Sequence, residues 1–131
     1  MPEGDSVLVA AARLHAALAG DRLVRTDLRV PAFATSDLSA QVMIEVAARG
    51  KHILMRTDAG LTLHTHFKMD GTWRLRRPGQ ALGGPDHEIR AVVATERWVA
   101  VGSRLGIVEL LPTRDEDRVL GHLGPDVLGA D

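Results

Sequence analysis

The 131-residue sequence contains no cysteine and no tyrosine, and only two tryptophans and two phenylalanines. The absence of cysteine excludes disulfides and thiolate zinc sites in this chain, and it fits a cytosolic protein. A core must therefore be aliphatic, which the 45% hydrophobic content allows. No apolar run approaches the roughly 20 residues that span a membrane, and the N-terminus lacks the features of a signal peptide. We expect one aliphatic-cored domain.

Charge is nearly balanced overall, with a formal net charge of −1, which argues against a wholly basic nucleic-acid binder. Its distribution is uneven. Residues 49–77 hold seven arginines and lysines against two aspartates, whereas residues 114–131 are acidic. The basic segment is what phosphate contact requires. The alternative is that these charges are only the solvated faces of strands.

Apolar residues recur at helical spacing from Val7 to Leu18, Asp5 or Ser6 can cap the helix, and Gly20 is a natural stop. A short helix is predicted over 115–120, with Thr113 as a possible cap. Between them the pattern is β-like, and the candidate strands are 22–30, 41–48, 52–57, 61–66, 72–77, 88–94, 97–101 and 106–111. Residues 78–86 are the best candidate for a mobile loop. We therefore predict a mainly β fold, a two-sheet antiparallel β-sandwich with an N-terminal α-helix and a flanking C-terminal helix.

The first residues carry the strongest chemical signal. Removal of Met1 would leave Pro2 as an N-terminal secondary amine beside the carboxylate of Glu3. An α-amino group with a pKa of roughly 8 is on the order of a tenth neutral at pH 7, whereas a lysine is less than about 0.1% neutral. Such an amine can attack an aldehyde carbon and form an iminium, with Glu3 placed to move protons. The bland alternative is an ordinary loop and an acidic residue that complements the helix dipole.

Four motifs occur in a fixed order: Met-Pro-Glu-Gly-Asp at 1–5, Arg-Gly-Lys-His-Ile-Leu at 49–54, His-Phe-Lys-Met-Asp-Gly at 66–71 and Ser-Arg-Leu-Gly at 103–106. Together they resemble the N-terminal half of the formamidopyrimidine-DNA glycosylase/endonuclease VIII family, and the opening is closer to endonuclease VIII-like members. The resemblance spans nearly all 131 residues. It implies a flattened β-sandwich and the N-terminal catalytic domain of a bifunctional DNA glycosylase/AP lyase in base-excision repair.

By this resemblance, Pro2 is the nucleophile at C1′ of a flipped nucleotide and Glu3 is the general acid/base. Lys51 matches a turn lysine that contacts phosphate beside the lesion and assists catalysis; its alternative is a surface lysine. Met69 matches a void-filling residue, within a DNA-binding motif that also contains His66 and Lys68.

Arg104 and Leu105 match two intercalating positions of the family, where an arginine faces the widowed base and an apolar side chain wedges the stack. For Met69 and Leu105 the alternative is core packing. His64 and His66 alternate along one strand and so point the same way, but no third ligand other than Asp70 is near, and we predict no metal site.

The sequence departs from the family in two places. Asp5 and Ser6 replace a proline and a glutamate found in many members, which leaves the sugar contact open. The family's second domain, with a helix-two-turns-helix element and usually a four-cysteine zinc finger, is absent from this chain. Zinc is expected only there, so no cofactor is expected here. We expect this single domain to fold but to bind DNA weakly and to have little or no activity alone.

The predicted partner is DNA with oxidised bases, chiefly pyrimidines, or abasic sites, at the cytoplasmic nucleoid and not at a membrane. Two other readings remain open. One is a non-catalytic DNA- or protein-binding module that uses the basic 49–77 segment and does not need Pro2. The other is an unrelated β-sandwich interaction domain with no affinity for DNA.

Overall fold

The structure, a computed structural model, describes residues 3–67 and 70–120, with side chains from Val7 onward. Its helices and strands are α1 (Glu3–Leu18), β1 (Arg25–Leu28), β2 (Met43–Arg49), β3 (His52–Thr57), β4 (Leu61–His66), β5 (Thr72–Arg76), β6 (Ile89–Ala94), β7 (Val99–Ser103), β8 (Ile107–Pro112) and α2 (Glu116–Leu120). Three short 3-10 helices, η1 (Pro31–Phe33), η2 (Asp86–Glu88) and η3 (Thr113–Asp115), lie in the connections. The predicted mainly β fold with flanking helices is confirmed.

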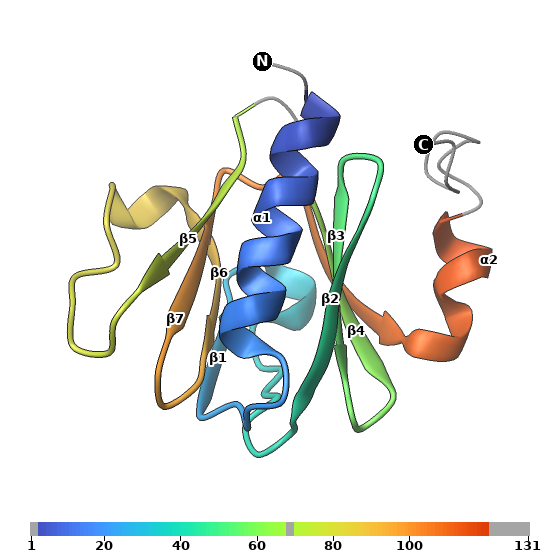
Figure 1. The fold of residues 1–131 in the computed structure, drawn as a ribbon, viewed down its shortest axis with the longest axis horizontal. Coiled ribbons are helices and arrows are strands. Elements are labelled where there is room, and N and C mark those ends of the chain that lie inside the picture. The colour runs from blue at the N-terminus through green and yellow to red at the C-terminus, as the bar shows by residue number, and fades with distance from the viewer. Residues whose placement is uncertain (1–2, 68–69, 121–131) are drawn as a thin grey trace.

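The strands form two four-stranded antiparallel sheets, one in the order β1-β6-β7-β5 and the other in the order β2-β3-β4-β8. The chain changes sheet after β1, after β4 and again after β7, so each sheet combines strands from distant parts of the sequence. Figure 1 shows α1 lying lengthwise against the sandwich, next to β2, and α2 on the outer side of the second sheet. Segments far apart in the sequence therefore lie side by side at the two ends of the sandwich.

The core is aliphatic, as the composition predicts. The buried face of α1 presents Val7, Leu14 and Leu18, none more than 2% exposed. They belong to one cluster with side chains from both sheets, including Ile53 of β3 and Val93 of β6. His15 also ties α1 to the second sheet, because its Nδ1 accepts the backbone N–H of Val46 at 3.1 Å. The helix that follows Pro2 in sequence is thus anchored along its length.

Two predicted helix caps were wrong. The helix begins at Glu3 and not after a cap at Asp5 or Ser6. Both residues lie within its first turn. Thr113 does not cap α2 either, because η3 intervenes and the Thr113 hydroxyl lies 2.8 Å from that of Thr62. The predicted strand 22–30 is also shorter, spanning Arg25–Leu28.

Candidate nucleic-acid interface

The segments that carry the sequence motifs meet at one end of the sandwich. His52, the first residue of β3, is the register partner of His66, the last residue of β4. Thr72 at the start of β5 faces Ser103 at the end of β7. The N–H of Gly106 donates to the carbonyl of His66 at 2.8 Å, which joins the two pairs. Figure 1 shows that α1 also begins at this end. We call residues 49–52, 66–67, 70–72 and 103–106, with the start of α1, the motif end.

Lys51 lies in the two-residue turn between β2 and β3. Gly50 precedes it with φ of 58°, the left-handed value that the first position of a type II′ hairpin turn requires. The carbonyl of Lys51 accepts the N–H of Phe67 at 3.2 Å, so this turn is fastened to the segment that follows β4. The lysine is therefore placed on a rigid hairpin beside the His66–Gly71 motif.

The His66–Gly71 motif closes on itself. The N–H of Gly71 donates to the carbonyl of Phe67 at 2.9 Å. A Cβ at Gly71 would lie 2.3 Å from that same oxygen, which only glycine avoids. Lys68 and Met69, predicted to contact DNA, lie outside the described residues, and so does Pro2. Glu3 is described only as the first residue of α1, without its side chain.

Arg104 stands at the tip of the turn between β7 and β8, with φ of 55°. Its side chain is 54% exposed and donates to the Glu88 carboxylate at 2.5 Å, and a second nitrogen lies 3.9 Å from Asp70. Its backbone N–H donates to the carbonyl of Glu88 at 2.9 Å. The pairing lowers the pKa of Glu88 and raises that of Arg104, mainly through the hydrogen bond that joins them. The predicted DNA-facing arginine is thus at the surface of the motif end and already paired.

Leu105 is placed differently from its neighbour. It is only 3% exposed and belongs to the main core cluster. Its Cδ1 would lie 2.6 Å from a Cβ added at Gly102, beside the Trp73 ring, so that glycine makes room for it. In the absence of DNA, Leu105 therefore packs in the core, which is the alternative to the wedge role given in the sequence analysis. The predicted wedge role would require Leu105 to leave the core when DNA binds.

A buried chain of polar side chains was not expected from the sequence. His64, fully buried, has its Nδ1 2.7 Å from a Glu109 carboxylate oxygen and its Nε2 2.6 Å from Nδ1 of His52. With an ionised Glu109 and a neutral His64, His64 donates from Nδ1 to Glu109 and accepts at Nε2 from His52. The His52 ring is 4.8 Å from that of His64 and 4.4 Å from that of His66, centroid to centroid. This series of buried polar side chains therefore connects β8 to the first residue of β3, next to Lys51.

The surroundings of His52 disfavour its protonation. Desolvation by burial is the largest cause, and the nearby His64 and His66 add to it, lowering the His52 pKa to about 4. His64 and His66 do share a sheet face, as the alternation predicts. Within residues 3–67 and 70–120, no group of three or more histidine, aspartate or glutamate side chains is arranged to hold a metal ion.

In the described part of the basic segment 49–77, three arginines are directed to partners within the domain. Arg56 is directed to the outer face of the second sheet, where it binds Glu116 of α2 through two nitrogens at 2.7 and 2.9 Å. Arg49 pairs with Asp117 at 3.3 Å. Arg77 lies over the Trp98 ring, 3.8 Å from its centroid. Several of the seven cations therefore fasten the domain together.

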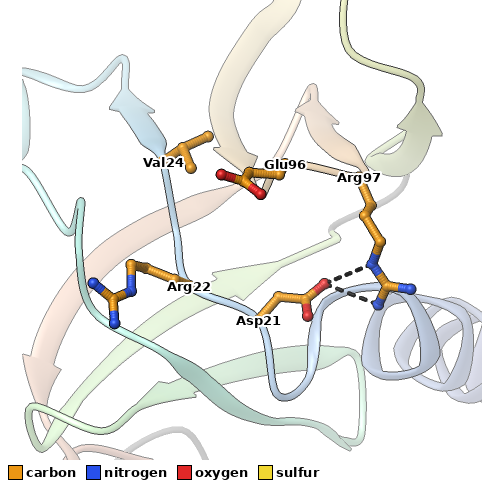
Figure 2. Close-up of a pocket in the computed structure, with 5 residues that line it drawn as sticks. All are labelled: Asp21, Arg22, Val24, Glu96 and Arg97. Carbon is orange, nitrogen blue, oxygen red and sulfur yellow. Dashed lines mark hydrogen bonds and ion pairs between the residues drawn. The ribbon is translucent and has the colours of Figure 1, made fainter.

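A surface pocket of about 430 Å³ lies at the opposite end of the sandwich from the motif end. Figure 2 shows its lining, in which Asp21 and Arg97 form an ion pair at 2.9 Å, with Arg22, Val24 and Glu96 around them. The backbone of Asp21 pairs with Met43, where β2 starts, far from Lys51. Among the residues that the structure describes, no predicted site residue lines this pocket. No described helix is long and apolar enough to cross a membrane.

The comparisons with known proteins agree on one family. Residues 1–104 match the formamidopyrimidine-DNA glycosylase N-terminal domain. The whole chain is 52% identical to a Streptomyces coelicolor protein named "Probable endonuclease 8 2" and 46% identical to the DNA-(apurinic or apyrimidinic site) lyase Nei2 of Mycolicibacterium smegmatis. It covers 48% and 50% of those two proteins, so it spans about half the length of the curated relatives it matches.

A solved structure with the same fold is that of Lactococcus lactis Fpg (MutM) in complex with DNA containing an oxidised pyrimidine. It superposes with a TM-score of 0.73 at 16% identity, over 93% of this chain and 47% of that one. The fold, the order of the motifs and the identity to the curated relatives along the whole of this chain agree. The chain belongs to the formamidopyrimidine-DNA glycosylase/endonuclease VIII family and corresponds to the N-terminal domain of its members.

Proposed function

We propose that this domain carries the catalytic residues of a bifunctional DNA glycosylase/AP lyase that acts at the bacterial nucleoid on oxidised bases, chiefly pyrimidines, and on abasic sites. The observation that supports it most is the convergence of the motif-bearing segments at the motif end, where α1 begins one residue after Pro2. The relatives' printed names, endonuclease 8 and DNA-(apurinic or apyrimidinic site) lyase, point to the same chemistry.

In the proposed reaction, loss of Met1 exposes the secondary amine of Pro2, which attacks C1′ of the flipped nucleotide. The C1′–base bond breaks and the base leaves with a proton. The sugar ring then opens as nitrogen and C1′ form an iminium, with Glu3 moving the protons. The iminium acidifies the C2′ proton. Removal of that proton expels the 3′ phosphate and breaks the strand.

The other assignments support binding and flipping. Lys51, on its rigid hairpin, contacts a phosphate beside the lesion. Arg104 and Met69 fill the space that the flipped nucleotide leaves, with Leu105 as the wedge; His66 and Lys68 contact the strand. The relatives are about twice as long as this chain. We expect their other half to supply much of the grip on DNA, so that this domain alone binds weakly.

Borohydride trapping on abasic-site DNA tests this chemistry, because borohydride reduces the iminium to a stable amine. Protein whose mass confirms loss of Met1 should give at most a weak covalent band, and that band should map to Pro2. Pro2→Gly, which keeps an N-terminal amine but not the ring, should lose most of it, and a preparation that retains Met1 should give none.

A chimera with the C-terminal half of the Mycolicibacterium smegmatis relative should trap more strongly than the domain alone. Absence of a band from both proteins would refute the Schiff-base chemistry. If the chimera still bound damaged DNA, that result would favour the non-catalytic binding module. Absence of DNA binding at low salt would favour the interaction domain.

A further inference from the structure

Arg104 is held by Glu88 in two ways at once. The guanidinium donates to the Glu88 carboxylate at 2.5 Å, and the Arg104 backbone N–H donates to the Glu88 carbonyl at 2.9 Å. A carboxylate oxygen of Asp70 lies 3.9 Å from the other terminal nitrogen of the guanidinium. The single arginine that the proposed function sends into DNA is therefore occupied by carboxylates when DNA is absent.

The backbone at Arg104 is itself constrained. Its φ of 55° lies in the left-handed region, which is disfavoured for a residue with a side chain. Such a conformation persists where the surroundings fix it, and these positions concentrate at functional sites. The bond from the Arg104 N–H to Glu88 is one such restraint. Glu88 thus fixes both the backbone from which the guanidinium projects and the direction in which it points.

Glu88 also balances other positive groups. His87 lies 4.0 Å from its carboxylate, and Arg74 is close enough to lower its pKa together with Arg104 and His87. The Glu88 side chain is only 21% exposed, whereas that of its neighbour Asp86 is 87% exposed. One carboxylate set between Arg104 and Arg74 reduces the attraction of these two arginines for any phosphate chain, damaged or not.

We propose that Glu88 is a specificity-determining residue, one that holds Arg104 at the surface against intact duplex and releases it only where a vacated nucleotide position offers replacement acceptors. This rests on the proposed function. In intact DNA the stacked bases leave no space for the guanidinium, so its pair with Glu88 is retained. At a flipped or abasic position the orphaned base supplies hydrogen-bond acceptors, so Arg104 exchanges its bond to Glu88 for bonds to that base.

The test compares two duplexes, one intact and one with a tetrahydrofuran abasic analogue, by fluorescence anisotropy at low salt. Glu88→Gln keeps the side-chain size and removes the charge. We expect it to raise affinity for the abasic duplex about two- to fivefold more than affinity for the intact duplex, because only the abasic complex has to break the Glu88–Arg104 ion pair. Asp86→Asn is the matched control. It removes the same charge two residues away, from a carboxylate that pairs with Arg29, and should shift both affinities by one common factor.

A double-mutant cycle assigns the effect to Arg104. In an Arg104→Ala background, Glu88→Gln should shift both affinities equally, as Asp86→Asn does. Glu88→Asp keeps the charge but shortens the reach, so it weakens the ion pair and should shift the ratio of the two affinities in the same direction as Glu88→Gln, by a smaller factor. Circular dichroism and thermal melting confirm that each variant is folded.

An unchanged ratio of the two affinities in Glu88→Gln, with DNA binding retained, would overturn the proposal. So would a changed ratio that persists without Arg104. Both measurements read binding and not Pro2 chemistry, so failure of borohydride trapping would refute the proposed reaction and leave this result standing. Absence of binding to either duplex by the unaltered domain would overturn both.

Discussion

Acidification should destabilise this domain through His52 before most carboxylates titrate. The His52 side chain is buried at 6% exposure, stacks on and is hydrogen-bonded to His64, and has the tilted ring of His66 beside it. In the unfolded chain a histidine has a pKa near 6.5, whereas in the folded domain burial and the two neighbouring histidines lower the His52 pKa to about 4. As the pH falls below about 6.5, His52 is protonated in the unfolded state but stays neutral in the folded state.

The sign and size follow from this difference. Because the folded pKa is the lower one, stability present above about pH 6.5 is lost progressively down to about pH 4. Between pH 7 and pH 5 the loss from this one group is about 2 kcal/mol. For a domain of this length that corresponds to a fall in Tm of roughly 6–10 °C.

His52→Asn isolates the effect. The asparagine amide can still donate to Nε2 of His64 from about the position of Nδ1, but it does not titrate. The variant should be less stable than the wild type at pH 7, because the ring stacking is lost, and should lose less stability between pH 7 and pH 5. His87→Asn is the control, since it makes the same substitution at a histidine that is 82% exposed and lies outside the buried histidine cluster.

The measurement is urea unfolding followed by circular dichroism at half-unit pH steps from 7.5 to 4.5. The reasoning fails if His52→Asn loses as much stability on acidification as the wild type. It also fails if His87→Asn flattens the profile to the same extent as His52→Asn.

Two further predictions concern packing. Glu116 is 6% exposed and binds Arg56 and the Thr62 hydroxyl; burial raises its pKa, but these bonds outweigh it and lower the pKa overall. Glu116→Gln should lower the free energy of unfolding by about 2–3 kcal/mol at pH 7, measured by urea unfolding. The stabilities of variant and wild type should converge as the pH falls through the pKa of Glu116 in the folded state. Glu45, the exposed partner of Arg56, is the control, and Glu45→Gln should cost less than about 1 kcal/mol. Leu105→Ala should cost about 2–4 kcal/mol by thermal melting, because it opens a cavity beside Trp73; a loss below about 1 kcal/mol would contradict its burial.

The positions of the strands were predictable because apolar alternation and turn residues are local signals. All eight predicted strands overlap observed ones, and α1 ends at Leu18 before Gly20, which adopts φ of 89°. The pairing was not predictable. β8 adds to β4 and β5 to β7, across long separations in sequence, because these contacts are set by the packing of two sheets and not by neighbours in the chain.

The candidate site was predictable in a different way. The motif residues could be named from resemblance, yet their burial could not. Leu105 and Arg104 are adjacent in sequence, but one is in the core and the other is at the surface. Glu88 and Glu109 carried no signal, since an isolated glutamate in a β-like segment is usually a solvated residue. Their roles became visible only when Arg104 and His64 were placed against them.

The end of the sandwich that is remote from the motif end is a suitable place for a fluorescent label. The turn between β3 and β4 lies at the end remote from the motif end, and Ala59 within it is exposed. Because the chain has no cysteine, Ala59→Cys would create its sole thiol, and a dye attached there would label every molecule at one defined place. Energy transfer between this dye and a second dye on a DNA duplex would measure DNA binding across the length of the domain. The surface that would meet the duplex stays unaltered.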